Sequence, residues 1–156
     1  MRLLINTESL ARSKKGTTFG LVYFETESGL FPGKGWTDLA PAFARAWLEA
    51  MIRIASGSTK TETVWFMDGP YTVEVSATNP GIVEMKFIHS PQKGDIVLHS
   101  AKAEIANLLQ NAVLVGEQVL ADYQQRRWRD NDTEPLVIAT KQGAKLLAKL
   151  KTRPPV

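Results

Sequence analysis

At 156 residues the chain has the length of one domain, and its 44% hydrophobic content is enough for a core, which excludes global disorder. The net charge of +3 is mild, and the absence of cysteine excludes disulfides, thiolate catalysis and cysteine-based metal centres. No apolar run is long enough for a signal peptide or a membrane span. We therefore expect a cytoplasmic protein with no membrane partner.

The first 60 residues predict short strands followed by one amphipathic helix. Residues 3–5 are apolar, and residues 17–25 alternate between two faces, as a half-buried strand does. Thr37 or Asp38 is placed to cap a helix that tolerates Pro41 in its first turn. Gly57 is placed to end this helix in a left-handed conformation.

The middle of the chain, from residue 61 to residue 99, predicts an antiparallel meander of about four strands. Asp68-Gly69 lies between two alternating segments and indicates a hairpin turn, because both residues tolerate positive φ. Further turns are expected at Asn79-Pro80-Gly81 and at residues 90–94.

The last third predicts two helices. Residues 100–128 contain no proline and repeat apolar residues at helical spacing. A polar break at residues 130–133 precedes a second apolar stripe that runs to Leu150. The short connection indicates an antiparallel helical hairpin. These long stripes are expected to pack in the core, although part of them could instead meet a partner protein or a second copy of the chain.

Taken together, the pattern predicts an α+β fold in a single domain, residues 1–156. Residues 1–99 form an antiparallel β-sheet of five to seven strands with one packed helix. Residues 100–152 form the C-terminal pair of helices.

The sequence offers little that resembles a catalytic or ligand site. His89 and His99, with Asp68 or Asp95 and a serine, could formally compose a hydrolase triad, but no nucleophile-elbow motif accompanies them. No metal-binding spacing occurs. Trp128 is flanked by arginines, an arrangement that suits base stacking but is also typical of a solvated helix end; nucleic acid is not expected as a partner. We predict no catalytic residue, no metal and no cofactor.

Two stretches together carry a family resemblance. Residues 31–38, Phe-Pro-Gly-Lys-Gly-Trp-Thr-Asp, lead into a helix that contains Trp-Leu-Glu-Ala at 47–50, and Trp-Phe-Met-Asp-Gly-Pro-Tyr follows at 65–71. This pattern, over about residues 17–77, resembles the immunity proteins encoded beside bacterial polymorphic toxins, including those of contact-dependent inhibition. Residues 100–156 show no part of it.

The resemblance implies a protein that is not an enzyme and that binds a cognate bacterial toxin, occluding its active site. The partner-binding candidates are the loop side chains Lys34, Trp36, Asp68 and Tyr71. Two alternatives remain open: a secretion chaperone or adaptor for an effector protein, with a homodimer formed through the C-terminal helices, and a small hydrolase that uses His89 or His99.

Overall fold

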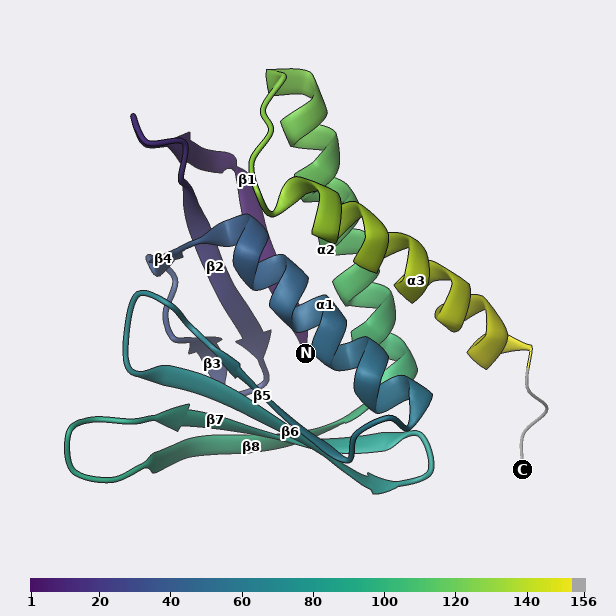
Figure 1. The fold of residues 1–156 in the computed structure, drawn as a ribbon. Helices are drawn as coiled ribbons and strands as arrows, with labels where there is room; N and C mark the ends of the chain where they lie inside the picture. The colour runs from purple at the N-terminus through teal and green to yellow at the C-terminus, as the bar shows by residue number, and fades with distance from the viewer. Residues whose placement is uncertain (153–156) are drawn as a thin grey trace.

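The computed structural model of the protein describes residues 1–152, which form two antiparallel sheets and three helices (Figure 1). The elements in chain order are β1 (Arg2–Arg12), β2 (Thr18–Thr26), β3 (Gly29–Phe31), β4 (Thr37–Asp38), α1 (Ala40–Ser56), β5 (Thr61–Trp65), β6 (Tyr71–Asn79), β7 (Ile82–His89), β8 (Ile96–Glu104), α2 (Ile105–Arg126) and α3 (Thr133–Lys151). The α+β class, the packed helix and the C-terminal helix pair are confirmed.

The strands form two sheets of four, where we expected one sheet of five to seven. In sheet A, β2 pairs with β1 on one side and with the short β3 and β4 on the other. Sheet B is the meander β5-β6-β7-β8, as the middle of the sequence predicts. Its two hairpin loops, 66–70 and 90–95, lie at the same end of the sheet. A hydrogen bond joins them, in which the Ser90 N–H donates to the Pro70 carbonyl at 2.7 Å.

One aromatic side chain links both sheets to α1. Phe24 of β2 is fully buried and meets Trp47 of α1 edge to face, with ring centroids 4.8 Å apart. The same ring contacts Phe66 and Phe87 of the sheet B side at 6.2 and 5.7 Å. Edge-to-face pairs of this kind add to the stabilisation from apolar burial. The two sheets and α1 therefore share one hydrophobic core.

Helix α1 begins and ends as its sequence indicates, but its predicted cap is wrong. Pro41 lies in the first turn, and Gly57 follows the helix at φ 78°. Leu39 occupies the N-cap position without a side-chain hydrogen bond. Thr37 and Asp38 instead form β4, which pairs with β2. The carboxylate of Asp38 accepts a hydrogen bond from the backbone N–H of Met67 and does not cap the helix.

The predicted start of the C-terminal helical region at residue 100 is also wrong. β8 continues through Glu104, and α2 begins only at Ile105. The alternation of Ala101 and Ala103 with polar neighbours explains why strand pairing with β7 wins over helix formation here. The helical hairpin thus covers residues 105–151.

The helices pack closely because of glycine. α2 and α3 lie side by side with α1 (Figure 1), and their apolar stripes face one another. A Cβ on Gly116 would lie 2.7 Å from Thr140 Oγ1, and one on Gly143 would lie 2.8 Å from Val113 Cγ2. Both glycines therefore permit contact distances that alanine would not.

Candidate functional site

The two sequence stretches that carry the family resemblance meet in space. Trp36, from the loop before β4, covers Gly69 of the β5–β6 loop: a Cβ on Gly69 would overlap Trp36 Cη2. The Trp36 ring also meets Tyr71 edge to face at 5.0 Å. Glycine is needed here because the indole occupies the space of a side chain.

A buried carboxylate joins these stretches a second time. Asp38 has no exposed surface, and its Oδ1 accepts the backbone N–H of Leu39 at 2.7 Å and of Met67 at 3.2 Å. Its Oδ2 accepts the Trp36 indole N–H at 3.3 Å and the Asp68 N–H at 3.4 Å. A carboxylate that accepts several N–H groups offsets the cost of its burial. Asp38 was not among the predicted binding residues, and its position in the Trp-Thr-Asp motif was the available signal.

Three of the four predicted binding residues come together at this end of sheet B. Trp36 and Tyr71 are half-buried, and Tyr71 stacks on His89 with centroids 4.9 Å apart. Asp68 has an exposed side chain on the 66–70 loop. Lys34 is exposed on the loop before Trp36 and forms no ion pair within residues 1–152. Trp36 and Tyr71 thus hold the loops together, and Asp68 and Lys34 offer charge to solvent.

Exposed apolar side chains concentrate beside these loops. Five of the nine large hydrophobic residues that are exposed within residues 1–152 lie here; we call them the tip surface: Trp65, Met67, Ile96, Val97 and Leu98. Trp65 is 61% exposed, an unusual state for the largest apolar side chain. Apolar side chains gathered in this way are typical of a protein-binding site. Sequence analysis did not identify this surface.

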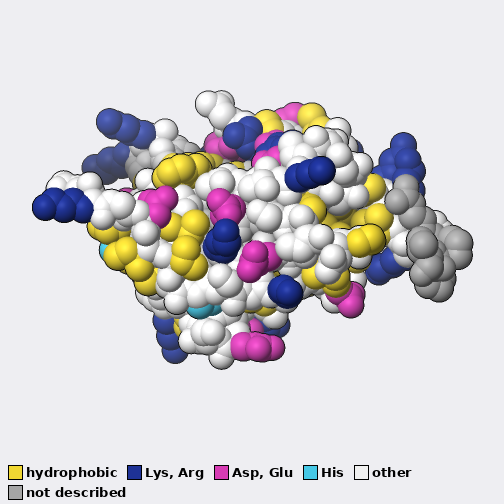
Figure 2. Space-filling view, turned by 90° about the horizontal axis from the view of Figure 1, so that it is seen from below, with side chains coloured by type: hydrophobic (Ala, Val, Ile, Leu, Met, Phe, Trp, Pro, Cys, Tyr) yellow, Lys and Arg dark blue, Asp and Glu magenta, His cyan; other side chains and the backbone are white. Residues whose placement is uncertain are grey.

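The register of sheet B places two members of the tip surface, Trp65 and Val97, on one face of the sheet. Trp65 pairs with Thr72, Thr72 with Ile88, and Ile88 with Val97 across all four strands. This row lies on the face of sheet B opposite the core, and its two inner members are buried. In Figure 2, which views that face, hydrophobic side chains gather toward the end of the sheet at the left. Phe66, the next residue along from Trp65, points into the core instead.

The edge strands β1 and β8 differ in whether side chains hydrogen-bond to their free backbone groups. At β1, the Asn111 side chain accepts the Leu3 N–H at 2.7 Å and donates to the Leu3 carbonyl at 3.2 Å, as a neighbouring strand would. Arg126 donates to two further β1 carbonyls, those of Leu10 and Thr7. β8 is also an edge strand, and its side chains from Ile96 to Leu98 are exposed. An open edge of this kind can pair with an added strand.

The two histidines pack against aromatic rings. His99 stacks on Phe87 with centroids 4.4 Å apart, and its Nε2 is buried without a hydrogen-bond partner. Burial lowers the pKa of His99 below its usual range. His89 stacks on Tyr71. A catalytic base needs a hydrogen-bonded partner that orients it, and the surroundings of the His99 Nε2 provide none.

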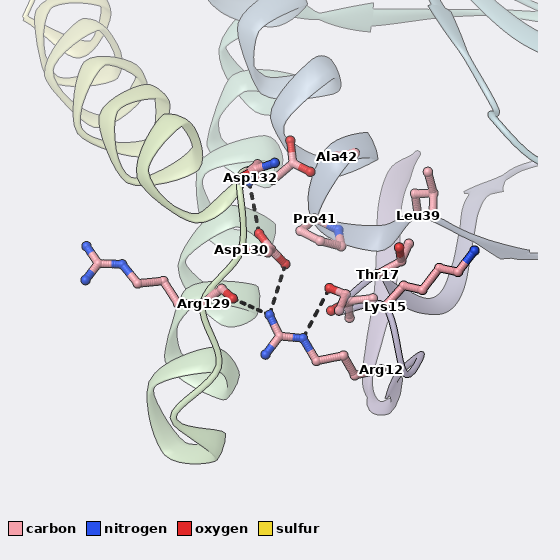
Figure 3. A pocket seen from close by; sticks show the side chains of 12 residues that line it. Arg12, Lys15, Thr17, Leu39, Pro41, Ala42, Arg129, Asp130 and Asp132 are labelled. Atoms are coloured by element: carbon pink, nitrogen blue, oxygen red, sulfur yellow. Dashed lines mark hydrogen bonds and ion pairs between the residues drawn. The ribbon is translucent and has the colours of Figure 1, made fainter.

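A polar pocket of about 330 Å³ lies at the other end of the molecule, between the β1–β2 hairpin, the start of α1 and the α2–α3 connection (Figure 3). Arg12 crosses it and donates to the carbonyls of Gly16 and Arg129, and its guanidinium lies 3.9 Å from Asp130. Asp130 also accepts from the Tyr123 hydroxyl at 2.7 Å. Arg12 and Asp130 are therefore already paired within the protein, and their contacts connect the three segments that surround the pocket.

Trp128 belongs to this joint. It meets Tyr123 edge to face at 5.8 Å, and the guanidinium groups of Arg126 and Arg12 lie 4.7 and 5.4 Å from its ring centroid. These are cation–π contacts within the chain. Of the arginines that flank Trp128 in sequence, only Arg126 makes such a contact. Arg127 and Arg129 are exposed, as expected of a solvated helix end.

Within residues 1–152 no group of three or more potential ligands is arranged to hold a metal ion. None of the helices described there is both long and apolar enough to cross a membrane. No protein-family model, curated protein or solved structure matches this chain.

Proposed function

We propose that this protein is an immunity protein, which acts in the cytoplasm by binding a cognate bacterial toxin and occluding its active site. It performs no chemistry of its own and needs no cofactor. The observation that carries the proposal is the tip surface, in which an exposed tryptophan projects from the paired strand β5.

The composition of the tip surface suits protein recognition. Tryptophan is over-represented among the side chains that contribute most to binding energy, and methionine is enriched in interfaces. Trp65 and Val97 project from paired strands, so little conformational freedom is lost when they bind. The exposed charge of Asp68, which follows Met67 in the chain, borders this surface and supplies electrostatic selectivity.

The family resemblance supplies the kind of partner. Its two motifs build the joint that fixes the 66–70 loop, through Trp36, Asp38 and Gly69. An inhibitor needs such a fixed loop because an ordered surface binds with a smaller entropic cost. The β8 edge adds a second mode of contact, in which an extended toxin segment pairs with Ile96–Leu98.

The experiment expresses this protein together with the toxin domain encoded next to it and measures bacterial growth. We expect the wild-type protein to restore growth and to co-purify with the toxin domain. The double variant Trp65→Ser/Val97→Glu should lose both, since it removes the apolar anchor and places a charge at the centre of the interface. Ile138→Ser, which changes an equally exposed residue on α3, should protect fully.

Three results would contradict the proposal. These are a locus that encodes no toxin or secreted effector, a double variant that protects as well as the wild type, and protection that survives without a complex. Unfolding curves of each variant separate loss of binding from loss of fold.

A homodimer through the C-terminal helices, as a secretion chaperone would form, is the second candidate. Leu114 on α2 and Ile138 on α3 are about half exposed and could meet a second copy. Sedimentation analysis distinguishes the two functions, because a chaperone dimer exists without its effector and a strict monomer contradicts it.

A further inference from the structure

Met67 is the most exposed of the four methionines of the chain. Its side chain is 51% exposed, whereas Met51 and Met85 are fully buried in the core. Met1 is 37% exposed and does not belong to the tip surface. Because oxidation of a thioether by a peroxide requires access to the sulfur, Met67 offers the most accessible target in the folded protein.

The local structure keeps Met67 in the tip surface. Phe66, the residue before it, is 2% exposed and anchors the loop in the core. The Met67 N–H donates to the carboxylate of Asp38 at 3.2 Å. Movement of the loop toward the core would break this hydrogen bond, so the thioether remains exposed to solvent.

We propose that Met67 is a modification site, at which a peroxide oxidises the thioether to the sulfoxide and thereby weakens binding at the tip surface. A lone pair of the sulfur attacks one peroxide oxygen, and the O–O bond breaks with its electron pair on the second oxygen. Proton transfer then gives methionine sulfoxide and, from hydrogen peroxide, water. The sulfur is oxidised and the peroxide is reduced. The effect on binding rests on the proposed function, whereas the oxidation itself does not.

The sulfoxide changes the chemistry of the tip surface at one point. A flexible apolar side chain becomes polar, with an oxygen that accepts hydrogen bonds. A partner that covers Trp65 and Met67 with apolar groups offers this oxygen no donor, so its hydrogen bonds to water are lost without replacement. Phe66 and Asp38 are not altered by the reaction. The modification therefore opposes binding and leaves the fold intact.

The first measurement needs no partner. The full-length protein is treated with dilute hydrogen peroxide, and mass spectrometry of its proteolytic peptides follows each methionine. We expect Met67 to be oxidised at least about tenfold faster than Met51 and Met85, which become accessible only when the protein opens. In concentrated urea the rates should converge. Equal rates at Met67 and Met85 in the folded protein would overturn the inference.

The second measurement compares reduced and oxidised protein in binding to the toxin domain encoded next to it. Oxidation should weaken the complex about tenfold or more. Methionine sulfoxide reductases, with dithiothreitol as the reductant, should restore the affinity, because they return the sulfoxide to the thioether. Thermal unfolding of the oxidised protein should match that of the reduced protein.

Two variants assign the effect to Met67. Met67→Leu keeps a large apolar side chain without a thioether, so its complex should resist peroxide. Met67→Leu/Leu114→Met moves the oxidisable side chain to α2, where Leu114 is 50% exposed, almost as exposed as Met67. This double variant should be oxidised at position 114 and still bind. Leucine and methionine have similar volumes, so both variants should fold.

Two binding results would overturn the inference. They are an unchanged affinity after complete oxidation of Met67, and a loss of affinity in oxidised Met67→Leu as large as that of the wild type. A reduced wild-type protein that forms no complex contradicts the immunity function instead. Retention on a phenyl column then tests the same surface: oxidation should lower retention more in the wild type than in Met67→Leu, and equal changes would overturn the inference.

Discussion

The carboxylate of Asp38 accepts the backbone N–H of Met67 across 29 positions of sequence, and so fastens the β5–β6 loop to β4. The same side chain holds Trp36, whose indole covers Gly69. This contact turns two separate motifs into one joint between sheet A and sheet B. It also sets the position from which Trp65 and Met67 project.

Asp38→Ala should lower the free energy of unfolding by about 2–4 kcal/mol, because it leaves the part-buried N–H groups of Met67 and Asp68 without their acceptor. Urea denaturation measures the change. Asp68→Ala is the control, since it removes an exposed carboxylate and should cost less than about 0.5 kcal/mol. Equal losses in both variants would show that Asp38 does not hold the loop.

Gly69→Ala should destabilise the protein by roughly 1–3 kcal/mol, since its methyl group would overlap the Trp36 indole. Gly35→Ala lies in open space and should be close to neutral. The near-ultraviolet circular dichroism of Trp36 should change in the first variant alone. A stable Gly69→Ala protein with an unchanged spectrum contradicts the proposed packing.

Substitutions of the neighbouring aromatic residues Trp65 and Phe66 should differ sharply in their effect on the free energy of unfolding. Phe66 is 2% exposed, and Phe66→Ala should cost about 3–5 kcal/mol through the cavity it leaves. Trp65→Ser should cost less than about 1 kcal/mol, because its ring faces solvent. Thermal unfolding of the two variants compares them. A large loss at Trp65 would mean that the tip surface serves stability and would weaken its assignment to binding.

Asn111→Leu should cost about 1–3 kcal/mol, since it leaves the Leu3 N–H and carbonyl at the β1 edge without partners. Hydrogen exchange at the Leu3 amide should accelerate in the same variant. Asn107→Leu changes an exposed amide on the same helix and should alter neither quantity appreciably. If both amides behave alike, the Asn111 side chain does not complete the strand edge.

Stability should fall as the pH drops from about 7.5 to 5, with His99 as one cause. Burial lowers the pKa of His99 in the folded protein, so below about pH 6.5 the unfolded chain binds the proton more readily. The free energy of unfolding therefore decreases on acidification until His99 is also protonated in the folded state. His99→Leu should flatten this part of the pH profile, measured by urea denaturation at each pH. His89→Gln should retain the slope that His99 contributes.

The sequence by itself determined the element types. Period-two alternation predicted the four strands of sheet B, helical spacing predicted α1 and the C-terminal hairpin, and Gly57 predicted the end of α1. These are local properties, because spacing alone decides which face of a strand or helix is apolar. The boundary at residue 100 failed because β7 offered strand pairing to residues that could also begin a helix.

Only the tertiary structure decided which of these residues form surfaces. Whether Trp65 or Phe66 faces solvent depends on the side of sheet B that meets the core, and alternation cannot tell the two sides apart. The roles of Asp38 and Asn111 depend on partners 29 and 108 positions away. The tip surface likewise exists only once the strands are paired, since it is assembled from separate segments that local spacing does not relate.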